Sequence, residues 1–192
     1  MTIYLVRHGE SECNVKGMLY GRTDCALTEL GRRQAAAVAE KLRGEHIERC
    51  VASPLIRASD TAGAAASALG LELEYDERLM EQDMGEWENV PFMEYFKSDS
   101  RVREMMKDWT VVAPPGGESF DSLRRRVAAA LDDIVAAGKD TLIVAHAGPL
   151  SAATAVLLGL PDSAARRFWY EQGCWTSVDN AQGIFKLRFF NK

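Results

Sequence analysis

Short runs of apolar residues alternate along the chain with longer stretches in which apolar residues recur at helical spacing. The runs at 2–6, 50–52 and 141–145 are apolar at nearly every position, and 71–75 is a further strand candidate. Continuous apolar runs of this length are typical of strands that are buried on both faces of a parallel sheet. The pattern therefore predicts a covered sheet rather than an exposed one.

The stretches between these strands carry start and stop signals of helices. A helix is predicted over 27–43, with Thr28 as its N-cap. A second is predicted to begin at Ser53-Pro54, with Ser53 as the cap and Pro54 in the first turn, and to run to Gly70.

The second half of the chain continues this alternation. Ser119 is predicted to cap a helix that ends at Gly138, and 148–158 is predicted to form another helix. The residues 176–179 and 184–190 are predicted to form a closing hairpin with its turn at 180–183.

The middle of the chain is less regular. Residues 91–109 have a helical pattern, and the Pro-Pro-Gly-Gly run at 114–117 breaks it. We predict one domain over 1–192 with an irregular helical cover segment at about 79–118.

Together these elements predict the fold class: an α/β three-layer sandwich with a mostly parallel central sheet, helices on both faces and an antiparallel edge at the C-terminus. Ligands of such sheets bind outside the carboxyl ends of the strands. His8, Arg57 and His146 each follow a predicted strand. They are therefore expected to meet at one edge of the sheet.

Composition narrows the function classes. The chain has 192 residues, of which 47% are hydrophobic and 27% charged, as expected of a globular protein. Its net charge of −5 argues against a general nucleic-acid binder. No leader-like segment or apolar run of membrane-spanning length is present, so we expect a cytoplasmic protein with no membrane partner.

The cysteines and histidines do not indicate a metal site. The four cysteines are Cys13, Cys25, Cys50 and Cys174. None forms a C-x-x-C pair, and a chain of this length builds a core without disulfides, so we interpret them as cytosolic thiols. No histidine has metal-ligand spacing, and we expect neither metal nor cofactor.

The predicted strand ends carry the groups that phosphoryl transfer requires. Arg7 and Arg57 are suited to bind phosphate oxygens, and His8 beside Arg7 is suited to attack phosphorus. His146 would add a further donor, and Glu81 is the candidate acid for the leaving oxygen.

Each of these residues also has a structural explanation. Taken singly, His8 and His146 suit hydrogen-bonded histidines at strand ends, and Glu81 suits a solvated turn. Arg57 lies in the predicted first turn of a helix, where the helix dipole disfavours a cation unless an anion is bound. Two histidines and two arginines at equivalent strand ends favour the functional interpretation.

Four stretches of the chain, in register and covering nearly its whole length, resemble the histidine phosphatase superfamily, also called phosphoglycerate mutase-like. These stretches are LVRHGESE at 5–12 with Asn14, GRTD at 21–24 with LTELGRRQA at 27–35, SPLIRASDTA at 53–62, and VAHAG at 144–148.

The resemblance implies a metal-independent phosphomonoesterase that acts on a small phosphorylated metabolite through a phosphohistidine at His8. It implies Glu81 as proton donor and Arg22 as a contact to the substrate body. The implied substrate-binding groups are Arg7, Asn14, Arg22, Arg57, His146, Ala147 and Gly148. A homodimer is left open.

Within the family, PGGES at 115–119 and GEWE at 85–88 resemble the alpha-ribazole phosphatases of cobalamin assembly, except that Asn89 stands where those carry Gly. The alternative is a cofactor-dependent phosphoglycerate mutase, although the stretch 98–112 offers few basic residues for a second phosphate. Its aromatic and methionine residues suit either an apolar cover or ordinary helix packing. A non-catalytic phospholigand-binding relative ranks lowest, because every pocket residue is kept.

Overall fold

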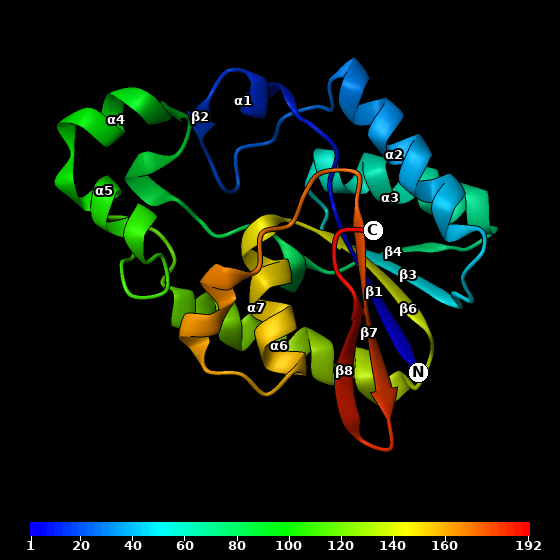
Figure 1. Cartoon of the computed structure of the whole chain (residues 1–192). Helices are drawn as coiled ribbons and strands as arrows, with labels where there is room; N and C mark the ends of the chain where they lie inside the picture. Colours follow the sequence, from blue (N-terminus) through cyan, green and yellow to red (C-terminus); the bar gives the residue numbers. More distant parts are fainter.

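A six-stranded mixed sheet lies at the centre of the computed structural model, which describes all 192 residues (Figure 1). The strand order is β4-β3-β6-β1-β7-β8. The first four pair in parallel, while β7 and β8 form an antiparallel edge, so the predicted fold class is confirmed. The strands are β1 Thr2–Arg7, β3 Arg49–Ala52, β4 Leu73–Tyr75, β6 Thr141–Ala145, β7 Trp175–Ala181 and β8 Ile184–Phe189.

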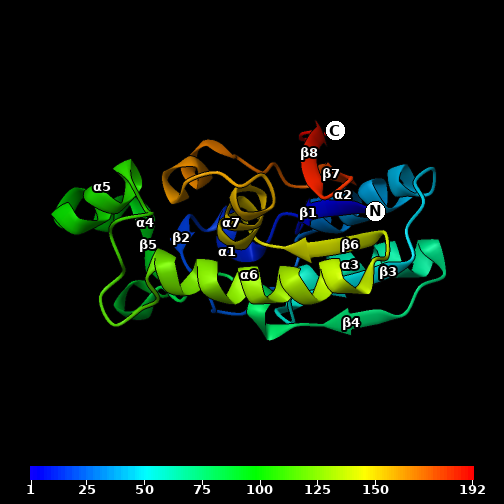
Figure 2. The same cartoon turned by 90° about the horizontal axis from the view of Figure 1, so that it is seen from below.

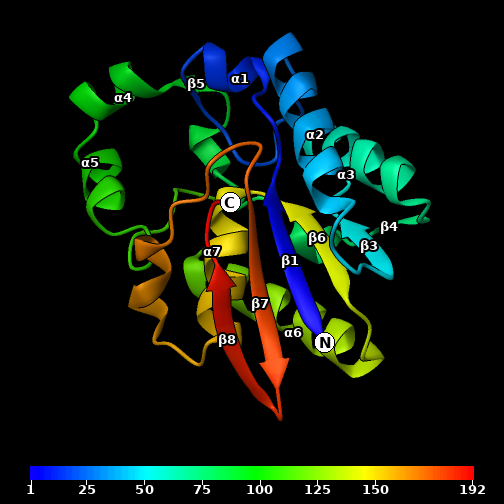
Figure 3. The same ribbon diagram turned by 45° about the vertical axis from the view of Figure 1, so that its right-hand side comes forward.

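Helices cover both faces of the sheet because its strands alternate their apolar side chains between the faces (Figures 2 and 3). Ile3 and Leu5 of β1 belong to the core formed with α6 and α7. Tyr4 and Val6 belong to the core formed with α2 and α3. These helices are α2 Glu29–Leu42, α3 Ile56–Leu69, α6 Phe120–Ala137 and α7 Ala147–Leu157.

The predicted caps hold for α2 and α6 but not for α3. Thr28 accepts a hydrogen bond from the Gly31 N–H, and Ser119 caps α6 in the same way. Ser53 does not cap α3, whose N-cap is Leu55 without a side-chain bond. The Ser53 hydroxyl lies instead 2.8 Å from Nε2 of His146. It is therefore hydrogen-bonded to a buried imidazole rather than, as the sequence pattern had predicted, to the N-terminus of the helix.

The segment 79–118 forms several short elements rather than one long helix. Asp99 has an extended backbone and caps α5 by accepting from the Arg101 N–H at 2.9 Å, which divides the helix predicted over 91–109. Met84, Trp87, Val102 and Met105 form a small separate core. The elements are η1 Glu77–Leu79, η2 Gly85–Trp87, β5 Val90–Pro91, α4 Phe92–Ser98 and α5 Ser100–Lys107.

Besides the short elements of the cover segment, three more elements have no counterpart in the sequence prediction. The strand β2 (Met18–Leu19) pairs with β5 and so attaches the cover segment to the N-terminal loop (Figure 1). The others are the helix α1 (Glu12–Val15) and the 3-10 helix η3 (Asp162–Arg167). None of the helices has both the length and the apolar composition needed to cross a membrane.

Two non-glycine residues at turns, Asn89 and Gln182, adopt the left-handed backbone conformation. Asn89 has φ 58°, so it occupies a backbone position that suits the glycine of the resembling sequences, and asparagine tolerates it. Gln182 has φ 57° and Gly183 φ 83°, which makes the hairpin turn shorter than predicted.

The interpretation of all four cysteines as free thiols is wrong. Cys13 and Cys25 form a disulfide with their Cα atoms 6.0 Å apart, while Cys50 and Cys174 are free. The chain between them folds back, since the Glu12 N–H donates to the Ala26 carbonyl at 3.0 Å. The bond therefore joins α1 to the loop before α2. Nothing in the local sequence indicates that Cys13 and Cys25 lie close together.

Reducing this disulfide is expected to lower the free energy of unfolding by about 2–3 kcal/mol, because the unfolded chain loses a constraint on a short loop. Urea unfolding with and without dithiothreitol measures the change. A Cys13→Ser variant should be insensitive to the reductant, whereas Cys174→Ser should respond as the wild type does. An unfolding midpoint of the wild type that ignores dithiothreitol would contradict the bond.

Candidate active site

Three predicted residues meet at one edge of the sheet. The strands β1 and β3 both pair in parallel with β6, so the residues that follow them lie at the same edge. The ring centroids of His8 and His146 are 5.1 Å apart. Arg57 follows β3 in the first turn of α3 and is completely buried. The sheet topology thus brings these groups together, as predicted.

The partners of His8 determine which ring nitrogen is free. Its Nδ1 lies 2.7 Å from the Gly9 carbonyl oxygen, which can only accept a hydrogen bond, so Nδ1 carries the proton. Nε2 therefore keeps a lone pair. Burial lowers the pKa of His8 well below its usual value, and Arg57 and Arg7 lower it further. At neutral pH the imidazole is uncharged and nucleophilic.

His146 is arranged as a hydrogen-bond donor. Its Nε2 lies 2.8 Å from the Ser53 hydroxyl, which also accepts from the Leu55 N–H at 3.4 Å. This hydroxyl has no acceptor other than Nε2, so its O–H donates to Nε2 and the proton of the neutral ring lies on Nδ1. Burial, followed by Arg57 and His8, lowers the pKa of His146, so the ring is neutral. Nδ1 is buried without a protein partner and can donate to a ligand.

Two arginines supply positive charge without carboxylate partners. Arg57 donates to the Thr23 carbonyl at 2.9 Å and to the Gly21 carbonyl at 2.6 Å, and Arg7 donates to the Tyr170 carbonyl at 2.8 Å. The Nε of each is buried without a partner. Burial lowers the pKa of both groups, but a guanidinium stays charged. Arg57 is buried and Arg7 is half-buried, and two cations without an ion-pair partner fit an anion such as a phosphoryl group.

Asn14 is held so that only its amino group remains available. Its Oδ1 accepts from the Ser11 N–H and hydroxyl, both at 2.9 Å, and from Gln172 Nε2 at 2.7 Å. A carbonyl oxygen with three donors has no further capacity, so Nδ2 is the group left for a ligand. Gln172, which orients Asn14 from 158 residues away in the chain, was not predicted from the sequence.

The structure separates Glu81 from its neighbouring carboxylates. Glu81 accepts from the Gln82 N–H at 2.9 Å and from the Gly148 N–H of α7 at 3.3 Å, which places it beside the helix that follows His146. Asp83 instead accepts from a backbone N–H within its own turn, and Glu86 is exposed. Glu81 is the carboxylate that lies at the site.

Gly148 leaves the space that this carboxylate occupies. A Cβ at Gly148 would overlap Oε1 of Glu81. If Glu81 is the acid that the sequence predicts, we expect Gly148→Ala to lower kcat for an alkyl phosphate by about tenfold or more, because the displaced carboxyl group is misaligned with the leaving oxygen. Steady-state kinetics measures it. Gly63→Ala is the control, since a Cβ there meets nothing within 4 Å, and equal rates for both variants would refute the effect.

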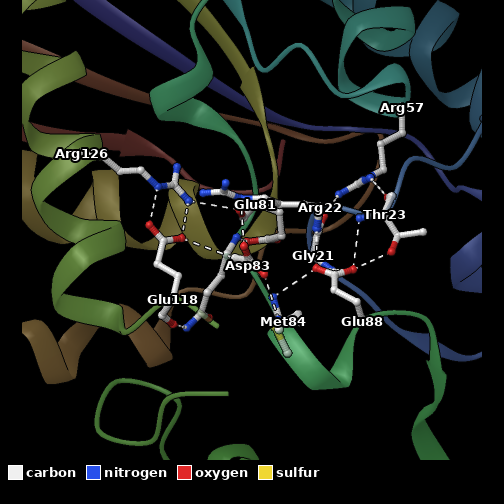
Figure 4. A network of polar contacts seen from close by, with 12 residues as sticks. Gly21, Arg22, Thr23, Arg57, Glu81, Asp83, Met84, Glu88, Glu118 and Arg126 are labelled. Carbon is white, nitrogen blue, oxygen red and sulfur yellow. Dashed lines mark hydrogen bonds and ion pairs between the residues drawn. The ribbon is translucent and has the colours of Figure 1, made fainter. Parts of the chain in front are cut away.

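Arg22 and Ala147 lie at the border of the site. Arg22 is exposed, and its Nε is 3.9 Å from Oδ2 of Asp83, whereas Arg57 is buried (Figure 4). Ala147 begins α7 directly after His146 and lines the same cavity as Glu81. A helix N-terminus of this kind presents backbone N–H groups to an anion.

A partly buried ion pair supports the turn that carries Glu81. Arg126 pairs with Glu118 at 2.7 Å and donates to the carbonyls of Arg78 and Glu81 (Figure 4). A Cβ at Gly117 would lie 2.5 Å from the Asp83 carbonyl oxygen, so the glycine lets the chain at 117 pack closely against this turn. Neither Arg126 nor Glu118 was predicted from the sequence to support the site.

An apolar cavity of about 230 Å³ opens beside Glu81 and Gly148. The cover segment and the segment after η3 provide its apolar wall. The apolar side chains that line it include those of Met84, Met105, Met106, Trp109, Phe168 and Trp169. A phosphorylated compound bound at the two histidines would therefore extend its alcohol part into an apolar space.

The third histidine lies at the opposite edge of the sheet. His46 Nδ1 is 3.1 Å from Asp140, which also accepts from the Thr2 N–H at 2.7 Å. Glu48 accepts from the Asp140 N–H at 3.0 Å. These contacts join the loop before β3 to β1 and β6. The side chains of His46, Glu48 and Asp140 therefore have a structural role.

Comparison with known proteins adds the following similarities. A family model for the histidine phosphatase superfamily (branch 1) matches residues 3–192. A protein named "Probable phosphoglycerate mutase GpmB" from Yersinia pestis is 40% identical over 182 residues, covering 93% of this chain and 85% of that protein. The alpha-ribazole phosphatase from Shigella flexneri has 30% identity and a TM-score of 0.91, covering 100% of this chain and 96% of its own. The mycobacterial glucosyl-3-phosphoglycerate phosphatase with VO3 has 28% identity and a TM-score of 0.92, covering 99% of this chain and 98% of its own.

Proposed function

Because this chain belongs to the histidine phosphatase superfamily, branch 1, we propose that it hydrolyses phosphomonoesters through a phosphohistidine at His8. The hydrogen bond from His8 Nδ1 to the Gly9 carbonyl carries the proposal, because it leaves Nε2 unprotonated near the guanidinium groups of Arg57 and Arg7. The reaction proposed for these residues proceeds by positioning and charge stabilisation, without a metal.

In the first step, Nε2 of His8 attacks phosphorus and forms a P–N bond while the P–O bond of the ester breaks. The departing oxygen takes the proton of the Glu81 carboxyl group and leaves as an alcohol. Arg7 and Arg57 bind the phosphoryl oxygens by charge-assisted hydrogen bonds, and Nδ1 of His146 donates another.

In the second step, the Glu81 carboxylate takes a proton from water, whose oxygen attacks phosphorus. The P–N bond breaks, inorganic phosphate leaves and the electron pair returns to Nε2 of His8. Glu81 is then protonated again, so both steps use the same group in opposite directions.

The substrate we propose is a small phosphorylated metabolite with an apolar or aromatic alcohol part. The apolar cavity beside Glu81 supports this class, because a short polar acid such as glycerate would leave its wall unfilled. Alpha-ribazole 5′-phosphate is the first candidate, since a solved relative of this fold is an alpha-ribazole phosphatase.

The second candidate is a phosphoglycerate mutase, which the name of the 40% identical Yersinia pestis protein favours. A mutase that uses a bisphosphorylated primer needs cations for a second phosphate. The cover segment offers few, because Arg101 pairs with Asp99 and Arg103 donates to the carbonyls of Phe96 and Lys97. These contacts favour the phosphatase.

Phosphate release from a panel of phosphomonoesters tests the proposal. The panel contains alpha-ribazole 5′-phosphate, an aromatic phosphate and both phosphoglycerates, and 3-phosphoglycerate isomerisation is followed with and without the primer. We expect the aromatic esters to be hydrolysed fastest. Isomerisation that outpaces release would establish the mutase, and phosphate binding without turnover would establish a binding protein.

Two matched variants test the role of the cavity. Met106 and Met93 are both about half exposed, but only Met106 lines the cavity. Met106→Ala should raise KM for the aromatic ester and leave KM for a short alkyl phosphate unchanged, whereas Met93→Ala should change neither. Identical behaviour of the two variants would remove the cavity from substrate binding.

A further inference from the structure

The carboxylate of Glu88 is surrounded by hydrogen-bond donors and has no cationic partner. It accepts from the backbone N–H groups of Gly21 at 3.0 Å, Arg22 at 2.7 Å, Thr23 at 3.1 Å and Met84 at 3.1 Å (Figure 4). It also accepts from the Thr23 hydroxyl at 2.6 Å. Five donors converge on this one side chain, which is more than the Glu81 carboxylate receives.

The loop that Glu88 holds is the loop that holds Arg57. The N–H groups of residues 21–23 point to Glu88, and the carbonyls of Gly21 and Thr23 accept from Nη2 and Nη1 of Arg57 (Figure 4). A single layer of peptide groups therefore separates the carboxylate from the guanidinium. Peptide dipoles aligned between opposite charges strengthen both sets of hydrogen bonds.

Glu88 is also joined to the turn that carries Glu81. Its bond to the Met84 N–H fixes the end of that turn. The loop of Gly21 also packs directly against this turn, because a Cβ at Gly21 would overlap the Gln82 carbonyl oxygen. The carboxylate thus lies where the loop of Arg57 and the turn of Glu81 meet.

The environment keeps Glu88 ionised. Burial raises the pKa of its carboxyl group, but the hydrogen bonds from Thr23 and from the N–H groups of Arg22, Met84 and Gly21 outweigh it and bring the pKa below the usual value. The charge is therefore present at neutral pH and would be lost only in acid.

We propose that Glu88 is a positioning residue of the proposed phosphatase: its carboxylate fixes loop 21–23 and so orients the guanidinium of Arg57 toward the phosphoryl group. This inference rests on the function proposed above. A purely structural tie between the cover segment and the loop is the alternative, and it predicts a change in stability without a change in phosphate affinity.

The test compares Glu88→Gln with Glu86→Gln. Glu86 is an exposed residue of η2, the short helix directly before Glu88, and its side chain makes no hydrogen bond. Inhibition by inorganic phosphate, kcat and KM for nitrophenyl phosphate, and Tm are measured for each. We expect Glu88→Gln to weaken phosphate binding and lower kcat/KM by about ten- to hundredfold, the range for losing hydrogen bonds to a charged group. Glu86→Gln should match the wild type.

Thr23→Val provides a second measurement that does not depend on Glu88→Gln folding. It removes the hydroxyl donor and keeps the carboxylate, and it should weaken phosphate binding by about fivefold. A lowered Tm with unchanged phosphate affinity in both variants would overturn the inference. An inactive wild type would overturn the proposed function instead, and phosphate binding by calorimetry would still decide the role of Glu88.

Discussion

Replacing His8 with alanine is expected to reduce phosphomonoester turnover by about 10⁴–10⁶-fold, the loss seen when an enzyme's nucleophile is removed. The physical reason is that Nε2 of His8 is the imidazole nitrogen at the site with a free lone pair. His146 Nε2 is paired with Ser53, and the arginines are cations. Phosphate release from nitrophenyl phosphate measures the loss, and phosphate binding should persist because the arginines remain.

His46→Ala is the matched control for this variant, because His46 lies at the opposite edge of the sheet and is mostly exposed. It should leave kcat and KM unchanged. Circular dichroism establishes that both variants fold. Turnover by His8→Ala within tenfold of the wild type would mean that water or another side chain attacks phosphorus.

Replacing Glu81 with glutamine is expected to reduce kcat by about 10²–10⁴-fold for an alkyl phosphate, the usual contribution of a general acid. The loss arises because an alkoxide leaves only when it is protonated. Nitrophenolate leaves without a proton, so the loss for nitrophenyl phosphate should be much smaller. The ratio of the two losses, rather than either alone, identifies the acid.

Asp83→Asn is the control for the second variant. Asp83 lies two residues away in the same turn, but its carboxylate binds the Gly85 N–H of that turn rather than the N-terminus of α7. It should affect both substrates equally and weakly. Equal losses for both substrates in Glu81→Gln would remove Glu81 from the acid role, and a larger loss in Asp83→Asn would assign that role to Asp83.

The parts of the site that lie at strand ends could be predicted from the sequence. Unbroken apolar runs identify parallel strands, and parallel strands place the residues that follow them at one edge. His8, Arg57 and His146 meet there for that reason alone. The N-caps Thr28 and Ser119 could also be predicted, because an N-cap is recognised from the residues next to it in the sequence.

The supporting residues could not be predicted because they act on backbone groups of distant segments. Glu88 binds a loop 65–67 residues earlier in the chain, and Arg126 binds carbonyls 45 and 48 residues away. Nothing in the local sequence marks a side chain that holds a remote peptide group. Gln172, which holds Asn14 from 158 residues away, was missed for the same reason.

At Ser53 and Asp99 the structure differs from what the neighbouring residues predict. Ser53 has the pattern of an N-cap, yet its hydroxyl serves His146 because a buried imidazole nitrogen must be satisfied. Asp99 interrupts a continuous helical pattern because its carboxylate caps a new helix. In both cases one side-chain hydrogen bond outweighs the propensity of the surrounding residues.

The measurement that tests the account most directly is chemical trapping of the phosphoenzyme. Wild-type protein is mixed with 32P-labelled substrate and quenched rapidly in alkali, and the labelled peptide is sequenced. We expect acid-labile, alkali-stable label on the peptide that contains His8, and none in His8→Ala. Acid-stable label on a serine, or turnover by the wild type with no labelled protein at any quench time, would contradict a phosphohistidine at His8.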